Sequence, residues 1–124
     1  MTIKSNLLCV AMTLASLYGC AIVEQGNLTV RGGEEFIYEC GNGDRIVARY
    51  YSLSDASLDF VKLFMPDGKE YTLPRAMSGS GARYTDDVDL VWWIKGDSAL
   101  VEKRAQDGQW QVGYPNCRRI GREK

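Results

Sequence analysis

Runs of alternating apolar and polar residues, each bounded by turn-forming residues, fill most of this sequence after its first thirty residues. In residues 34–40, for example, Phe36, Tyr38 and Cys40 fall on one side of an extended chain. Runs of this kind recur about every eight to twelve residues, and no segment requires a helix. The spacing predicts an all-β domain, built as an antiparallel barrel or a sandwich.

Six segments are expected to be strands, and turn signals separate several of them. The expected strands are residues 34–40, 45–53, 57–66, 69–74, 88–96 and 109–114. Turns are expected at 41–44, 66–68 and 106–108, where Gly follows Asn or Asp. Composition leaves residues 98–105 open to either a strand or a helix. The run at 88–96 is so apolar that we expect burial on both faces.

The amino-terminal segment has the pattern of an export signal. Lys4 is its single charge, and LLCVAMTLASL at residues 7–17 is an apolar run. A run of this length is too short for a membrane-spanning helix, which needs about 20 residues, and it suits the core of a signal peptide. We therefore expect residues 1–19 to be removed when the chain is exported.

The end of this segment, LYGC at residues 17–20, resembles the lipobox of bacterial lipoproteins. The resemblance implies cleavage before Cys20, acylation of that residue, and a tether over residues 20–27. Ala21, in place of Asp, implies sorting to the outer membrane with the domain facing the periplasm. The lipid would then be the chain's only contact with the membrane, since several acyl chains hold firmly. The alternative is an ordinary secretory signal cleaved nearby.

Charge argues against a nucleic-acid partner. The whole chain has a net charge of −1, and loss of Lys4 with the signal moves it to −2. Nucleic-acid binding would require a strongly basic face. The tail RRIGREK at residues 118–124 is locally basic, and we interpret it as a solvated terminus.

Cys40 and Cys117 remain once Cys9 has left with the signal and Cys20 is acylated. An even pair in an exported protein predicts a disulfide, which would join the start of the fold to its end. Two free thiols, or two thiols with a metal, are the alternatives. Because the sequence contains no His, a zinc site would lack its usual further ligands, and we expect no metal or cofactor.

Few residues are available for catalysis. The absence of His removes a His-based triad or general base, and oxidised or acylated cysteines leave no thiolate nucleophile. Asp86, Asp87 and Asp89 form a cluster, and paired carboxylates can hydrolyse glycosides. Neighbours in an extended chain point to opposite faces, however, so a charged turn is the better interpretation. We therefore expect a binding protein and not an enzyme.

The segment MSGSGARY at residues 77–84 contains more Gly and Ser than a turn requires. Glycine lets a backbone approach another surface closely, and Arg and Tyr are favoured at interfaces. Further along the chain, Lys95 precedes the turn-forming Gly96. Two such loops at one end of a barrel would present a hydroxyl and an ammonium group together. The alternative is a loose connector and a solvated lysine.

Five features, in this order, resemble the signature of the membrane-bound inhibitors of c-type lysozyme. They are YEC at 38–40, DG–Y–LP at 67–74, SGSGARY at 78–84, WWIKGDSALVE at 92–102 and the late Cys117. The resemblance implies an eight-stranded antiparallel barrel with one disulfide over residues 28–124. It also implies a surface that plugs the active-site cleft of a c-type lysozyme, which would protect bacterial peptidoglycan.

The resemblance implies particular site residues as well. Ser80 corresponds to the hydroxyl that the family inserts, and Lys95 corresponds to the inserted cation. Two departures from the pattern bear on where Lys95 lies relative to Ser80: Ile94 replaces Thr, and the segment 85–94 is a residue longer than is typical. Tyr84 is expected to support the site or to contact the enzyme. The other lysozyme-binding residues are expected to be Arg83, Gly79 and Gly81.

A second function stays open, in which a small periplasmic barrel carries an apolar ligand. Eight strands leave room for side chains or at most one small ligand. Trp92, Trp93 and Trp110 could line such a pocket, although a packed core is the simpler interpretation. The sequence also leaves homodimerisation open.

Overall fold

The computed structural model describes residues 26–123 of the chain. The expected signal peptide, Cys20 and most of the tether at 20–27 lie outside the described residues. Within the described part, no helix is long and apolar enough to cross a membrane.

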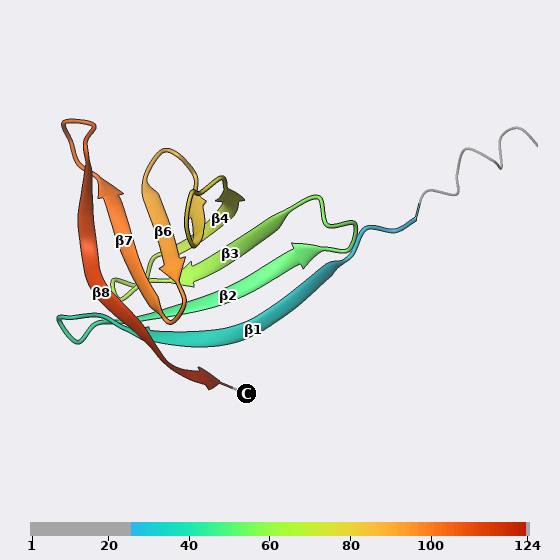
Figure 1. The fold of residues 1–124 in the computed structure, drawn as a ribbon, viewed down its shortest axis with the longest axis horizontal. Helices are drawn as coiled ribbons and strands as arrows, with labels where there is room; N and C mark the ends of the chain where they lie inside the picture. Colours follow the sequence, from blue (N-terminus) through green and yellow to red (C-terminus); the bar gives the residue numbers. More distant parts are fainter. Residues whose placement is uncertain (1–25, 124) are drawn as a thin grey trace, which may run out of the picture.

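Eight antiparallel strands follow one another around a closed barrel, in which the last strand pairs with the first (Figure 1). The strands are β1 (Val30–Glu39), β2 (Arg45–Leu53), β3 (Asp59–Phe64), β4 (Glu70–Ala76), β5 (Ala82–Thr85), β6 (Leu90–Lys95), β7 (Ser98–Arg104) and β8 (Trp110–Glu123). The predicted antiparallel barrel is confirmed, and the sandwich is excluded. Residues 98–105, which composition left undecided, contribute a strand.

One strand, β5, was not predicted, and β8 extends well beyond its predicted range of 109–114. The short β5 begins directly after the glycine–serine segment and pairs with β6 in continuous register from Ala82–Ile94 to Thr85–Val91. The interpretation of the tail as a solvated terminus was wrong for residues 118–123, because β8 continues to Glu123 and pairs with β1. The backbone groups at the edge of β1 require hydrogen-bond partners, and this pairing supplies them whatever the side chains of the tail.

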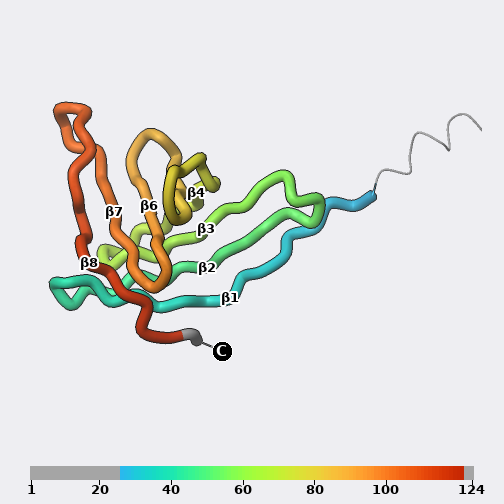
Figure 2. The backbone as a smooth tube through the Cα atoms, in the orientation of Figure 1, coloured from blue at the N-terminus to red at the C-terminus, as the bar shows by residue number. Residues whose placement is uncertain are grey.

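The bend in β8 is what closes the barrel. Figure 2 traces its first half beside β7 and its second half along β1. The pairing with β7 shifts register between Ala99 and Val101, and the pairing with β1 shifts between Ile37 and Tyr38. Such bulges increase the local twist of a strand, which lets one strand join two neighbours around a small barrel.

Aromatic side chains fill the interior of the barrel. Trp92 is fully buried and meets Tyr38 edge to face, with 4.9 Å between ring centroids. Its indole Nε1 donates a hydrogen bond to the hydroxyl of Tyr50 at 3.0 Å, and Tyr50 and Tyr38 share a second bond of 3.0 Å. Each buried polar tip is thereby satisfied, as buried Trp and Tyr require. Trp92 is the core residue that was expected.

The other two tryptophans differ from that expectation. Trp93 and Trp110 are partly exposed and are not members of the buried core. Successive residues of a strand point to opposite faces, so Trp93 points outward because Trp92 points inward.

The predicted disulfide joins Cys40 to Cys117, with an S–S distance of 2.02 Å. Cys40 follows the end of β1 and Cys117 lies in β8, so the bond links the two strands that close the barrel. Both residues are buried. Free thiols and a two-thiol metal site are therefore excluded.

Candidate protein-binding site

Ser80 and Lys95 come together beside the start of β5 and the end of β6. Ala82 pairs with Ile94, so the preceding residue Gly81 lies opposite Lys95. A Cβ at Gly81 would lie 2.2 Å from the carbonyl oxygen of Ile94 and 2.7 Å from Cγ of Lys95, and the residue has φ +66°. Only glycine fits this close approach without strain. The glycine between Ser80 and β5 thus lets the segment pack directly against Lys95.

Trp93 contacts both residues from the outer face of the barrel. Its indole Nε1 donates a hydrogen bond of 2.9 Å to the carbonyl oxygen of Ser80. The ammonium nitrogen of Lys95 lies over its ring, 4.7 Å from the centroid. A cation in this position is attracted to the ring face, by about 0.5–1 kcal/mol at an exposed site. Trp93 therefore sets where the two groups lie relative to each other.

The two presented groups are exposed. Ser80 fixes its backbone by accepting hydrogen bonds from the hydroxyl of Ser78 and from Trp93. Its own hydroxyl has no hydrogen-bond partner among residues 26–123, and no carboxylate in that range forms an ion pair with Lys95. The site thus offers one hydroxyl and one ammonium group on a held backbone.

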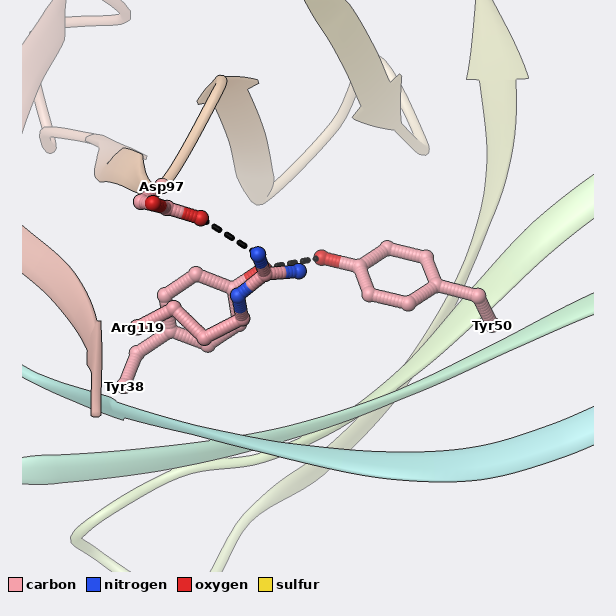
Figure 3. A network of polar contacts seen from close by, with 4 residues as sticks. All are labelled: Tyr38, Tyr50, Asp97 and Arg119. Carbon is pink, nitrogen blue, oxygen red and sulfur yellow. Dashed lines mark hydrogen bonds and ion pairs between the residues drawn. The ribbon is translucent and has the colours of Figure 1, made fainter. Parts of the chain in front are cut away.

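The turn after Lys95 is tied to β8. Gly96 has φ +58°, and Asp97 forms an ion pair with Arg119 (Figure 3). The backbone N–H of Arg119 also donates to the carbonyl oxygen of Asp97 at 2.8 Å. The guanidinium lies 5.4 Å from the ring centroid of Phe36. Side chain and backbone together hold the turn, and with it the end of β6.

Figure 3 also shows Tyr38 and Tyr50, which lie beside the pair of Asp97 and Arg119. Burial raises the pKa of Tyr38, and the hydrogen bond between Tyr38 and Tyr50 and the charge of Arg119 partly offset this rise. Burial also raises the pKa of Tyr50, and its neighbour Tyr38 raises it further. Both phenols therefore stay neutral at physiological pH and act as hydrogen-bonding core groups.

The remaining predicted site residues divide between the core and the surface. Tyr84 is only 6% exposed, lies opposite Trp92 in the sheet, and has its ring centroid 5.7 Å from that of Tyr50. Burial raises its pKa. Such a position suits support of the site and offers little area to a partner. Arg83 lies opposite Trp93 on the outer face, and Gly79 is exposed with open space around it.

Neither departure from the family pattern interrupts the pairing of β5 with β6, which brings Lys95 beside the segment of Ser80. Ile94 packs against the buried core, so its side chain lies inside the barrel. Because β5 and β6 stay in register, any extra length in the segment falls in the turn between them, at residues 86–89. There Asp86 accepts hydrogen bonds from the backbone N–H groups of Val88, Asp89 and Leu90.

The same hydrogen bonds explain the acidic cluster. Slight burial raises the pKa of Asp86, but the bonds from Asp89, Val88 and Leu90 lower it more, and the net shift is below the usual value. This carboxylate is an acceptor that organises a turn. The interpretation of the cluster as a charged turn fits this geometry.

Sequence reasoning did not single out Trp93, Asp97 or Arg119 as parts of the site. Trp93 was assigned to the core and Arg119 to a solvated tail. The alternation within WW at residues 92–93 was the available signal for Trp93, since one of the two rings had to point outward. For Arg119 no local signal existed, because its partner lies 22 residues away.

Comparisons with known proteins agree with these features. The model of the family described as membrane-bound lysozyme-inhibitor of c-type lysozyme matches residues 38–110. A Yersinia enterocolitica protein named membrane-bound lysozyme inhibitor of C-type lysozyme is 36% identical over 87 residues, which cover 70% of this chain and 63% of the relative. An Escherichia coli K12 protein of the same name is 49% identical over 41 residues, 33% of this chain and 37% of the relative.

The match thus spans less than two thirds of either relative. A crystal structure of Pseudomonas aeruginosa MliC in complex with hen egg white lysozyme is similar to this fold, with a TM-score of 0.55 and 23% identity. The similarity covers 77% of this chain and 87% of that one. At this identity it shows a shared fold.

Proposed function

Because this chain belongs to the family of membrane-bound lysozyme inhibitors of c-type lysozyme, we propose that it blocks the active-site cleft of a c-type lysozyme with Ser80 and Lys95. The observation that carries the proposal is the contact of both residues with Trp93, whose indole N–H binds the backbone carbonyl of Ser80 while its ring lies under the ammonium group of Lys95. The proposed partner is a lysozyme whose action on bacterial peptidoglycan is thereby prevented.

The chemistry of the target explains why these two groups would inhibit. Lysozyme cleaves glycans with two carboxyl groups, one kept protonated by an apolar pocket and one ionised. In a cleft with restricted water, the ammonium of Lys95 meets concentrated negative charge at a lowered dielectric constant. The hydroxyl of Ser80 can hydrogen-bond the other carboxyl group. Hydrogen bonds with an ionised partner are about twice as strong as neutral ones.

The barrel contributes by holding the site before binding. Gly81 packs against Ile94, Trp93 holds Ser80 and Lys95, and the Asp97–Arg119 pair holds the following turn. Loops that are already ordered lose little conformational entropy when they bind, so more of the contact energy appears as affinity. Inhibition requires only that the site be occupied and sugar excluded. We propose accordingly that the chain has no catalytic activity of its own.

We further propose that the mature protein is anchored in the outer membrane through acylated Cys20 and faces the periplasm. The apolar run at residues 7–17 and the LYGC sequence support this placement, as does the membrane-bound character in the family's description. Labelling of the intact chain with a radioactive fatty acid tests it. Label in the wild type and none in Cys20→Ala is expected, and equal labelling of the two would contradict it.

Inhibition itself is tested by lysis of cell walls with hen egg white lysozyme. Residues 21–124, which retain every strand, should stop the fall in turbidity. Lys95→Ala should weaken inhibition about thirtyfold, since truncating a hot-spot residue costs about 2 kcal/mol or more. Lys69→Ala removes an exposed lysine in the turn between β3 and β4 and should keep full potency. Full potency of Lys95→Ala would refute the assignment.

A further inference from the structure

A row of side chains crosses three strands of the barrel next to the candidate site. Lys95 of β6 lies directly opposite Ser98 of β7, and Ser98 lies directly opposite Arg118 of β8. Directly opposed residues in antiparallel strands point to the same face of the sheet. All three residues are exposed. Arg118 therefore stands on the outer face, two strands away from the lysine assigned to the lysozyme cleft.

The same residues line one hollow in the surface. It has a volume of about 310 Å³, and Lys95, Ser98 and Arg118 contribute to its wall together with Trp93 and Leu100. Trp93 and Leu100 are themselves directly opposed on β6 and β7. The hollow thus combines two cations and a hydroxyl with the apolar surfaces of Trp93 and Leu100, and it includes Trp and Arg, the residue types enriched at the centres of interfaces.

The nearby carboxylates are already engaged with other cations. Asp97, two residues after Lys95, pairs with Arg119. Glu39, the residue of β1 opposite Arg118, pairs with Arg45 at 3.6 Å. Among residues 26–123 no carboxylate forms an ion pair with Arg118. The hollow between Lys95 and Arg118 is consequently positive, and the guanidinium of Arg118 is available to a partner.

We infer that Arg118 is a second cationic contact of the inhibitor, which binds a carboxylate at the rim of the lysozyme cleft while Lys95 occupies the catalytic centre. This inference rests on the proposed function. Two strand spacings put about 10 Å between the backbones of Lys95 and Arg118. The two carboxyl groups of a retaining glycosidase are only about 5–5.5 Å apart. Because Lys95 and Ser80 are already assigned to those two carboxyl groups, Arg118 is assigned to a separate carboxylate, which its planar fork can bind through two parallel hydrogen bonds.

The test compares two variants that lose the same charge. Arg118→Gln removes the proposed contact. Arg31→Gln removes an exposed arginine near the start of β1, about 26 Å along that strand from the residue opposite Arg118. The inhibition constant of residues 21–124 against hen egg white lysozyme is measured for both at low and at physiological salt. We expect Arg118→Gln to be about tenfold weaker at low salt, with a smaller deficit at high salt, because salt screens a contact at an interface rim. Arg31→Gln should match the wild type.

Each other outcome has a defined meaning. Equal potency of the wild type and Arg118→Gln overturns the inference and leaves the proposed function standing. An equal loss in Arg118→Gln and Arg31→Gln also overturns it, because the effect would then be one of net charge. A wild-type chain that does not inhibit refutes the proposed function and the inference together. Should Arg118→Gln not fold, Arg118→Lys keeps the charge and loses the fork, and unchanged potency of that variant overturns the inference.

Discussion

Trp93 contacts both residues that are proposed to enter the lysozyme cleft. Its N–H group holds the backbone of Ser80, and its ring lies under the ammonium of Lys95. The preceding residue, Trp92, contributes to the core instead of the site, since it is buried and hydrogen-bonded to Tyr50. The two adjacent tryptophans therefore separate the stability of the barrel from the geometry of its site.

Replacement of Trp93 tests this separation. Trp93→Phe keeps an aromatic ring beside Lys95 and removes the donor to Ser80. A hydrogen bond contributes about 1 kcal/mol, so the inhibition constant should rise about fivefold while the melting temperature changes little. Trp110→Phe, at a partly exposed tryptophan of β8, is the matched control and should leave inhibition unchanged. Wild-type potency of Trp93→Phe would mean that Ser80 needs no such support.

Gly81 and Gly79 give a second matched pair at single residues. A methyl group at Gly81 would collide with the carbonyl of Ile94, whereas nothing lies within 4 Å of the same position at Gly79. Gly81→Ala should therefore destabilise the protein by about 1–3 kcal/mol and weaken inhibition. Gly79→Ala should do neither. Thermal unfolding and turbidity assays measure both effects, and equal behaviour of the two variants would contradict the packing described for Gly81.

The sequence could identify the exposed pair but not the residues that hold it. Ser80 and Lys95 were named because the motifs around them resemble a known family. Trp93 was missed because an apolar strand does not reveal which of two adjacent rings points inward. Arg119 was missed because its role depends on a partner in another strand. Residues that act through long-range contacts carry no local signal.

The turn between β5 and β6 depends on the carboxylate of Asp86. It accepts hydrogen bonds from three backbone N–H groups at 2.8–3.2 Å. Its position at the far end of β5 from Ser80 means that it stabilises the hairpin without touching the candidate site. A change at Asp86 should thus affect stability and leave inhibition intact.

The lowered pKa of Asp86 gives this turn a pH dependence with a definite sign. The folded protein holds the carboxylate ionised below its usual pKa of 3.8. The stabilisation that the ionised Asp86 gives to the folded protein is therefore complete above about pH 5. It is lost as the pH falls through the lower pKa of the folded state. Asp86→Asn keeps an acceptor and loses the charge, so it should be less stable than the wild type by about 0.5 kcal/mol at pH 7, a small value because the group is largely screened by solvent.

Urea unfolding between pH 2 and pH 7 measures this difference. The gap between the wild type and Asp86→Asn should close toward pH 2. Asp87→Asn leaves the three hydrogen bonds in place and should follow the wild type throughout. A gap that does not depend on pH would show that the charge of Asp86 contributes nothing.

At the level of strands, prediction succeeded where a segment carried its own pattern. Alternation and turn signals located β1 to β4 and β6, because each of these strands has an apolar face of its own. β5 was missed because it is only four residues long and follows a glycine–serine segment. The last part of β8 was missed because its charged residues suggest solvent. Pairing with β1 determines its conformation, and pairing depends on the whole fold.

At the scale of the whole molecule, the site depends on closure of the barrel, which β8 and the disulfide provide. The bond joins cysteines separated by 77 residues. Cross-linking a loop of this length stabilises a protein by about 4 kcal/mol in chain-entropy models. The same strand that carries Cys117 also carries Arg118 and Arg119, so closure positions the turn that follows Lys95.

Removal of the disulfide should therefore affect stability and inhibition together. The double variant Cys40→Ala, Cys117→Ala should unfold at a lower urea concentration, with a loss of about 4 kcal/mol. Its inhibition of lysozyme should weaken at temperatures where the barrel begins to open and persist at low temperature. Urea curves and turbidity assays at two temperatures test this. Unchanged stability would contradict the role given to closure.

The most direct measurement is a crystal structure of residues 21–124 bound to hen egg white lysozyme. We expect the ammonium of Lys95 and the hydroxyl of Ser80 to lie within hydrogen-bonding distance of the two catalytic carboxyl groups, on the backbone that Trp93 holds. A complex in which the catalytic cleft stays empty, or in which another face of the barrel occupies it, would contradict the proposed mode of inhibition.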